Sequence, residues 1–122
     1  MEKAAILHYM EQNFCFVNET GDYVFRIRTK QDDLDKVIFH CRDKSSTVFE
    51  INEQKSIEME KVASDGIVDY YEVTMPLKVT LLRYFFELID KFGQKLFYGK
   101  YEFYEKKPVN ISQMFDCPVK SK

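Results

Sequence analysis

Apolar and polar side chains alternate along several segments of this chain, and this pattern limits the folds that it can adopt. Tyr23, Phe25 and Ile27 fall on one face of an extended chain, whereas Arg26 and Arg28 fall on the other. A period of two with one polar face is typical of an antiparallel strand that packs one side on a core. The sequence therefore predicts a half-buried strand over residues 22–29.

The same alternation, or a short apolar run bounded by turn residues, predicts further strands along the chain. These runs cover residues 13–17, 37–42, 56–63 and 68–73. Residues 56–63 also contain good helix formers such as Lys61, but the alternation of Ile57 and Met59 favours a strand. Polar or glycine-containing segments at 19–22, 30–33 and 64–66 are predicted to be the turns.

The segment 79–89 is apolar on all sides and fits both a helical and an extended template. Its content of Thr, Tyr and Phe favours a strand. The polar run 90–93 ends in Gly93 and is typical of a hairpin turn. We therefore predict a two-stranded hairpin from Thr80 to Tyr98.

Many short strands joined by turns predict an all-β chain, either an antiparallel β-sandwich or a barrel. The 122 residues suffice for one domain, and 11 Phe and 8 Tyr supply side chains that favour strands. Residues 106–122 show no periodicity. We predict a sandwich over residues 1–105, followed by a linker or tail over 106–122.

Charge, hydropathy and cysteine spacing exclude several partner classes. Lys and Arg (18) nearly balance Asp and Glu (20), so there is no basic stripe that would bind nucleic acid. No run approaches the roughly 20 apolar residues of a membrane helix, and no signal peptide is evident. Cys15, Cys41 and Cys117 are too far apart for a zinc motif. Cys15 and Cys41 are expected to be small core residues, and the chain is expected in the reducing cytoplasm.

Catalytic patterns are missing from the sequence. We find no nucleophile elbow and no phosphate-binding glycine loop. His40 is predicted to be a surface histidine on the polar face of its strand, and His8 to make a structural hydrogen bond. The carboxylates of Asp32, Asp33, Asp65 and Asp69 are interpreted as turn residues in preference to calcium ligands. We therefore expect no catalytic residues, no metal site and no cofactor.

Tyrosines are the remaining candidates for binding, because sugars stack their apolar faces on flat rings while polar groups hold the hydroxyls. The candidates are Tyr70, Tyr71, Tyr84, Tyr98, Tyr101 and Tyr104, although most are expected to pack in the core. Alternation places Tyr70 and Tyr71 on opposite faces of one strand, so one of the two should be exposed.

Five short segments occur in an order that resembles a known domain. They are Ala5–His8, Arg26–Lys30, Ser64–Gly66, Asp69–Tyr71 and Leu82–Phe86. In this order they resemble the N-terminal domain of neopullulanases, cyclomaltodextrinases and maltogenic amylases. These are intracellular enzymes of glycoside hydrolase family 13, and the domain is also classed as carbohydrate-binding module family 34. The segment Phe115–Lys120 looks like the linker that precedes the catalytic barrel in that family.

The resemblance implies an immunoglobulin-like antiparallel β-sandwich of about eight strands. It also implies that this chain is non-catalytic, because the family's catalytic carboxylates lie on the barrel. The domain would pack on the catalytic barrel of its own or a partner subunit and narrow the active-site cleft for cyclodextrins, maltooligosaccharides and pullulan. In this interpretation the chain is an excised or truncated piece of a longer enzyme.

One loop departs from the family pattern. The family commonly has a segment similar to Tyr-Gly-Asp-Pro-Tyr, whereas this chain has His40 to Ser46, in which only Asp43 matches. Tyr71 stands where Trp is common. Tyr70, Tyr71 and Asp43 are therefore the carbohydrate-binding candidates. Two alternatives stay open: a free-standing α-glucan-binding module and an unrelated immunoglobulin-like domain that binds protein.

Overall fold

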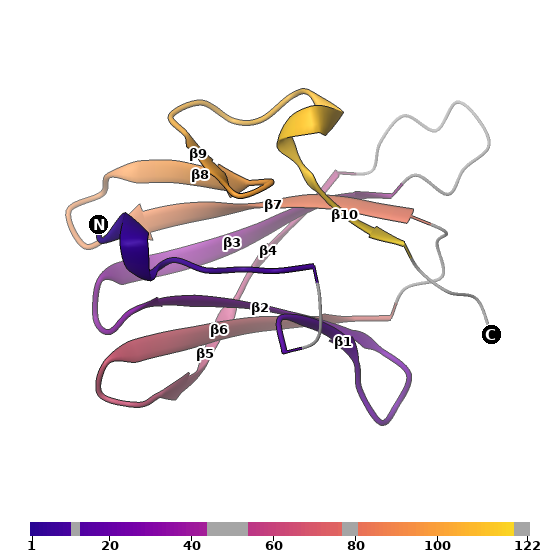
Figure 1. Cartoon of the computed structure of the whole chain (residues 1–122), viewed down its shortest axis with the longest axis horizontal. Helices are drawn as coiled ribbons and strands as arrows, with labels where there is room; N and C mark the ends of the chain where they lie inside the picture. Colours follow the sequence, from indigo (N-terminus) through magenta and orange to yellow (C-terminus); the bar gives the residue numbers. More distant parts are fainter. Residues whose placement is uncertain (11–12, 44–53, 77–80, 119–122) are drawn as a thin grey trace.

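Two stacked antiparallel sheets make up the computed structural model, which describes residues 1–10, 13–43, 54–76 and 81–118 (Figure 1). The four-stranded sheet has the order β1 (Cys15–Val17), β2 (Tyr23–Lys30), β6 (Val68–Met75), β5 (Glu60–Ser64). The six-stranded sheet has the order β4 (Gln54–Glu58), β3 (Leu34–Asp43), β7 (Leu81–Asp90), β8 (Lys95–Gly99), β9 (Glu102–Tyr104), and β10 (Phe115–Pro118) also pairs with β7. The predicted all-β sandwich is confirmed, as is the hairpin of β7 and β8 around Gly93.

The core lies between the two sheets and is largely aromatic. Phe25 from one sheet faces Phe39 and Tyr84 from the other, with ring centroids 4.8 and 4.9 Å apart. Tyr84 also stacks on Phe115 at 5.4 Å, and all four rings are fully buried. The inward positions are the apolar ones of the alternating pattern, because successive strand residues point to opposite faces.

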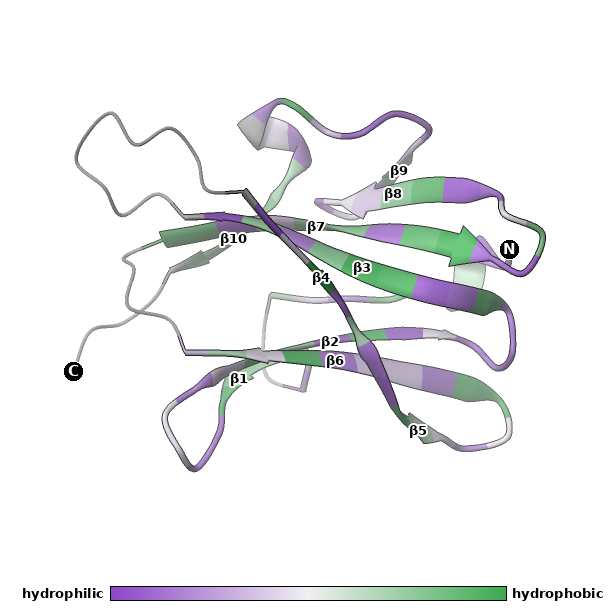
Figure 2. Cartoon of the chain, turned by 180° about the vertical axis from the view of Figure 1, so that it is seen from behind, coloured by the Kyte–Doolittle hydropathy of each residue, from purple (hydrophilic) through white to green (hydrophobic). Residues whose placement is uncertain are grey.

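The run 54–64 forms two strands instead of one. β4 pairs with β3 in the six-stranded sheet, and β5 pairs with β6 in the four-stranded sheet. Figure 2 shows the chain passing from one sheet to the other between these strands. Met59 lies at the crossing, where it is buried and its amide donates to the Val37 carbonyl at 2.8 Å. The predicted extended conformation is thus confirmed, but its partners come from both sheets.

Residues 105–118 differ from the linker that the sequence predicts. η2 (Ile111–Gln113) is a 3-10 turn, and β10 pairs with β7 from Phe115 opposite Tyr84 to Pro118 opposite Leu81. Phe115 and Met114 are buried. The sandwich therefore extends to Pro118, well beyond the predicted boundary at residue 105. Aperiodicity failed as a signal because β10 is only four residues long.

His40 is a second difference from the sequence prediction. It lies on the outward face of β3, as alternation requires, yet only 6% of it is exposed. Pro108 and Met114, from the segment predicted to be a linker, line the same small hollow as His40 and Phe85. The histidine is buried because this segment folds over the outer face of the six-stranded sheet.

The N-terminal segment is not a regular strand. Residues Lys3–Ala5 form the 3-10 turn η1, and Leu7 makes an isolated bridge with Arg28. Within the described ranges, no helix is long and apolar enough to cross a membrane.

Candidate functional site

A groove on the outer face of the four-stranded sheet is the best candidate for a binding site. It measures about 470 Å³, within the range of about 300–1,000 Å³ that is usual for small-molecule sites. Strands β2, β5 and β6 supply most of its walls, and the segment before β1 supplies the rest. It is lined by Asn13, Phe14, Arg26, Val62, Ala63, Tyr70 and Glu72.

Arg26 and Glu72 form the polar centre of the groove. They are directly opposite each other on β2 and β6, and Arg26 Nε donates to Glu72 Oε2 at 2.5 Å. Arg26 Nη1 also donates to the Asn13 carbonyl at 3.0 Å. Both side chains are partly exposed, so they retain free hydrogen-bonding capacity towards a ligand.

Aromatic rings flank this ion pair. The guanidinium carbon of Arg26 lies 5.2 Å from the ring centre of Phe16 and 6.0 Å from that of Tyr70. The contacts hold Arg26 in one orientation by cation–π attraction. A flat ring beside a fixed ion pair can offer a stacking surface together with hydrogen bonds, which is the combination that a sugar requires.

The two adjacent tyrosines separate as alternation predicts. Tyr70 faces the groove and is partly exposed, whereas Tyr71 faces the core and is only 4% exposed. The Tyr71 hydroxyl donates to the Leu34 carbonyl at 3.4 Å, and burial raises the pKa of this hydroxyl. Tyr71 is therefore a packing residue. The side chain of Asp43, the third candidate, lies outside what the structure describes.

The other candidate tyrosines occupy different environments. Tyr84 and Tyr98 are buried in the core, where they cannot stack on a ligand. Tyr104 is half-buried on β9, and Tyr101 is 45% exposed beside Tyr9, with ring centres 6.1 Å apart. Among the six tyrosines singled out from the sequence, Tyr70 alone lines the large groove.

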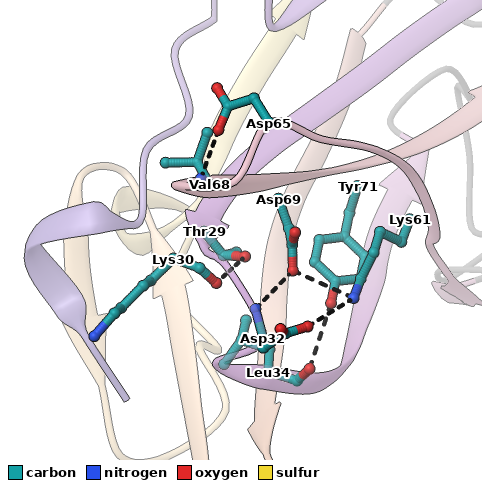
Figure 3. A network of polar contacts seen from close by, with 9 residues as sticks. All are labelled: Thr29, Lys30, Asp32, Leu34, Lys61, Asp65, Val68, Asp69 and Tyr71. Carbon is teal, nitrogen blue, oxygen red and sulfur yellow. Dashed lines mark hydrogen bonds and ion pairs between the residues drawn. The ribbon is translucent and has the colours of Figure 1, made fainter.

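The buried carboxylate of Asp69 pairs with the more exposed Lys61 beside the β2–β3 turn (Figure 3). The carboxylate of Asp69 is 1% exposed, accepts the Asp32 amide at 3.0 Å and lies 3.2 Å from Lys61 Nζ. Burial on its own would raise the pKa of Asp69, but interactions with Ser64, the Asp32 amide and Lys61 outweigh burial and hold this pKa below its ordinary value. The same hydrogen-bonded contact raises the pKa of Lys61. This network fastens β5, β6 and the β2–β3 turn together, which is a structural role.

Asp65, another of the predicted turn carboxylates, is also structural. Asp65 Oδ1 accepts the amides of Ile67 and Val68, both at 2.9 Å, and so closes the β5–β6 turn. Across the described residues, no three His, Cys, Asp or Glu side chains converge as metal ligands.

A row of hydroxyl, imidazole and carboxylate lies on the outer face of the six-stranded sheet. Ser56 Oγ is 2.8 Å from His40 Nδ1, and His40 Nε2 is 2.7 Å from Glu87 Oε1. This order resembles that of nucleophilic hydrolases. The hollow beside it measures only about 10 Å³, room for about one water molecule, and the imidazole stacks on Phe85 at 4.9 Å. The row joins β4, β3 and β7 side by side, and the hollow at His40 is too small for a substrate.

Fold and groove together define a class: an immunoglobulin-like β-sandwich domain with an aromatic groove on one outer face. The chain matches the family of alpha amylase, N-terminal ig-like domains over residues 1–120. The chain belongs to this family, and the alternative of an unrelated immunoglobulin-like domain is thereby excluded.

Several relatives carry names from the same enzyme group. The chain is 32% identical over 123 residues to a maltogenic alpha-amylase of Bacillus acidopullulyticus, covering 97% of this chain and 20% of that protein. It is 28% identical over 117 residues to a cyclomaltodextrinase of Geobacillus thermopakistaniensis, covering 96% of this chain and 20% of that protein. The chain therefore spans about one fifth of the length of these relatives.

Solved structures agree with the fold. A cyclomaltodextrinase structure superposes with a TM-score of 0.83 at 27% identity, covering 98% of this chain and 20% of that one. The type III pullulan hydrolase from Thermococcus kodakarensis superposes with a TM-score of 0.63 at 13% identity, covering 91% of this chain and 16% of that one. The second likeness concerns the fold alone.

The residues that sequence analysis missed are Arg26 and Glu72. Alternation placed Arg26 on a polar face, and Glu72 lies two residues after Tyr70 on the same strand. The missing information was the pairing of β2 with β6, which sets Arg26 opposite Glu72.

Proposed function

We propose that this chain is a non-catalytic N-terminal accessory domain of an alpha-amylase-family glycoside hydrolase that acts on small α-glucans. One observation carries the proposal: the family match over residues 1–120, in a chain that spans a fifth of relatives named maltogenic alpha-amylase and cyclomaltodextrinase. The acid–base chemistry of glycoside cleavage needs a pair of carboxylic acids flanking the scissile bond. Such a pair would come from the catalytic part of the enzyme.

In this proposal the domain packs on the catalytic barrel of the same or a partner subunit and narrows the cleft around short substrates. Exposed apolar side chains support a packing role. Phe92 is 96% exposed, and Ile67 and Val109 are each 75% exposed. Phe92 and Ile67 lie in the β7–β8 and β5–β6 turns, at the same end of the sandwich in Figures 1 and 2. Burying such side chains at an interface removes apolar area from water.

An assay of the chain alone tests its non-catalytic character. We expect no release of sugar from β-cyclodextrin, pullulan or starch, because no described carboxylate pair faces a substrate-sized groove as an acid and its partner would. The measurement is reducing-sugar release over a long incubation. A full-length cyclomaltodextrinase in the same assay establishes its sensitivity. Turnover by the purified chain that persists after further purification would overturn the proposal.

A second candidate function is direct binding of α-glucan, which the groove around Tyr70 favours. A sugar ring stacked on Tyr70 would place its hydroxyls near Arg26 and Glu72, which can donate and accept hydrogen bonds respectively. The rest of the enzyme would then benefit from substrate held near its cleft.

Titration calorimetry with maltooligosaccharide tests this binding. We expect weak binding with a dissociation constant in the millimolar range, and a loss of at least about tenfold in Tyr70→Ala because the stacking surface is removed. Tyr104→Ala is the matched control, since Tyr104 is also half-buried but lies on β9 of the other sheet. A flat trace for the unsubstituted chain, or equal weakening in both variants, would exclude the Tyr70 groove as the binding site.

A further inference from the structure

Cys15 and Cys117 lie in contact between the two sheets, although 102 positions separate them in the sequence. Their sulfur atoms are 3.5 Å apart. Cys15 is on β1 opposite the buried Phe25, and Cys117 is on β10 opposite the buried Leu82. Residues directly opposite each other on paired strands point to the same face. Both cysteines therefore point inward from facing sheets, and the backbone itself brings them together.

We propose that Cys15 and Cys117 are an oxidisable pair that forms a disulfide between the two sheets by exchange with a small-molecule disulfide of the glutathione class. The sulfur atoms need to approach by only about 1.5 Å to reach the bond length of about 2.05 Å. A rotation of the side chains can supply a movement of this size without a change of strand pairing.

The two thiols differ in their surroundings, and the difference sets the order of the steps. The contact with Cys117 lowers the pKa of the Cys15 thiol, against the opposing effect of burial. The same contact and burial raise the pKa of the Cys117 thiol. Cys15 is also the more exposed of the two. Since the thiolate is the nucleophile and must reach its target, Cys15 is the residue that attacks first.

The thiol–disulfide exchange takes place in two steps. The Cys15 thiolate attacks one sulfur of oxidised glutathione, forms a mixed disulfide and releases one glutathione thiolate. Cys117 loses its proton to solvent, attacks the Cys15 sulfur and releases the second glutathione thiolate. The protein gives up two electrons and two protons, and one glutathione disulfide becomes two glutathione thiols.

The bond would fasten β10 to the N-terminal part of the chain. A cross-link between residues so far apart removes much of the freedom of the unfolded chain, and its stabilising effect grows with the length of the enclosed loop. In the reduced state the two thiols make a non-covalent contact. The oxidised chain should therefore resist heat and denaturant better than the reduced chain.

Intact-mass measurement after treatment with oxidised glutathione tests the proposal. We expect the chain to lose about 2 Da, the mass of two hydrogen atoms, and non-reducing peptide mapping to join the peptides of Cys15 and Cys117. The thermal midpoint should rise by about 10 °C or more and return on addition of dithiothreitol.

Single Cys→Ser substitutions show which cysteines form the disulfide. Cys41→Ser should still form the bond, because Cys41 lies on β3 and is not part of the pair. Cys15→Ser and Cys117→Ser should not form it, and Cys117→Ser should keep a stable glutathione adduct on Cys15. The proposal is overturned if the folded unsubstituted chain keeps three free thiols, if it accumulates a lasting mixed disulfide, or if peptide mapping joins Cys41 to either partner.

Discussion

His8 shows at the scale of one residue how a polar side chain becomes part of an aromatic core. It is fully buried, and its ring centre lies 4.8 Å from the ring centres of both Phe86 and Phe115. Nδ1 lies 2.7 Å from the Arg26 carbonyl and Nε2 lies 2.6 Å from the Tyr84 hydroxyl. A carbonyl only accepts, so Nδ1 carries the proton and Nε2 accepts from Tyr84. The structural hydrogen bond predicted from sequence is confirmed.

This burial predicts a loss of stability in acid. Burial lowers the pKa of His8 from 6.5 to about 4, against the raising effect of the Arg26 carbonyl. Between these values the unfolded chain binds a proton that the folded chain does not, so stability is fully present above about pH 6.5 and falls as the pH drops towards about 4. The contribution lost is about 3 kcal/mol at most. Urea unfolding at pH 7.5, 5.5 and 4.5 measures it.

His8→Gln is the matched control for the acid effect. Glutamine keeps a donor and an acceptor but does not titrate in this range. We expect it to be less stable at neutral pH, with a shallower fall in stability between pH 6.5 and 4. Parallel slopes for the two proteins would assign the acid sensitivity to other groups.

Among the elements of the fold, the segment from Glu105 to Pro118 completes the six-stranded sheet. It covers His40 and Phe85 on the outer face and then enters the sheet as β10. Gly99 at the end of β8 makes this path possible. A Cβ atom at Gly99 would lie 2.1 Å from the carbonyl oxygen of Gln113, far inside van der Waals contact.

Gly99→Ala should therefore displace the 105–114 segment from the sheet. We expect a destabilisation of about 1–3 kcal/mol, as for other overpacked sites, and faster hydrogen exchange confined to peptides from this segment. Gly93→Ala is the control, because a Cβ there meets nothing within 4 Å and only the positive φ of 83° opposes the change. If both variants lose the same stability and neither alters exchange in the segment, Gly99 does not hold the segment in place.

In the whole molecule, the two outer faces of the sandwich differ in how far they are covered. The face of the six-stranded sheet is partly covered by the chain's own segment, whereas the face of the four-stranded sheet carries the open groove with Tyr70, Arg26 and Glu72. The inner faces meet in the aromatic core and in the contact of Cys15 with Cys117. Binding is therefore proposed for one outer face, and the redox chemistry for the space between the sheets.

The candidate site was only partly predictable from sequence. Alternation correctly separated Tyr70 from Tyr71, because successive side chains of any strand point to opposite faces. Which tyrosine faces the core depends on the other sheet. The groove depends on Arg26 and Glu72, which are 46 residues apart in the sequence and meet across β2 and β6.

Elements without a local signal were missed for similar reasons. β8 and β9 are joined at Lys100 and Tyr101, both with positive φ (47° and 70°), where Asn or Gly would have marked a hairpin turn. β10 is short, and its strand character comes from pairing with β7.

The all-β class, the strands with a clear alternation and the hairpin of β7 and β8 were predictable from sequence, because they depend on a period of two and on turn chemistry. Four features were visible only in the folded chain: the switch between sheets at Met59, the burial of His40, the pairing of β10 with β7 and the contact of Cys15 with Cys117. These features depend on contacts between distant segments, and no local pattern records which segments will become neighbours.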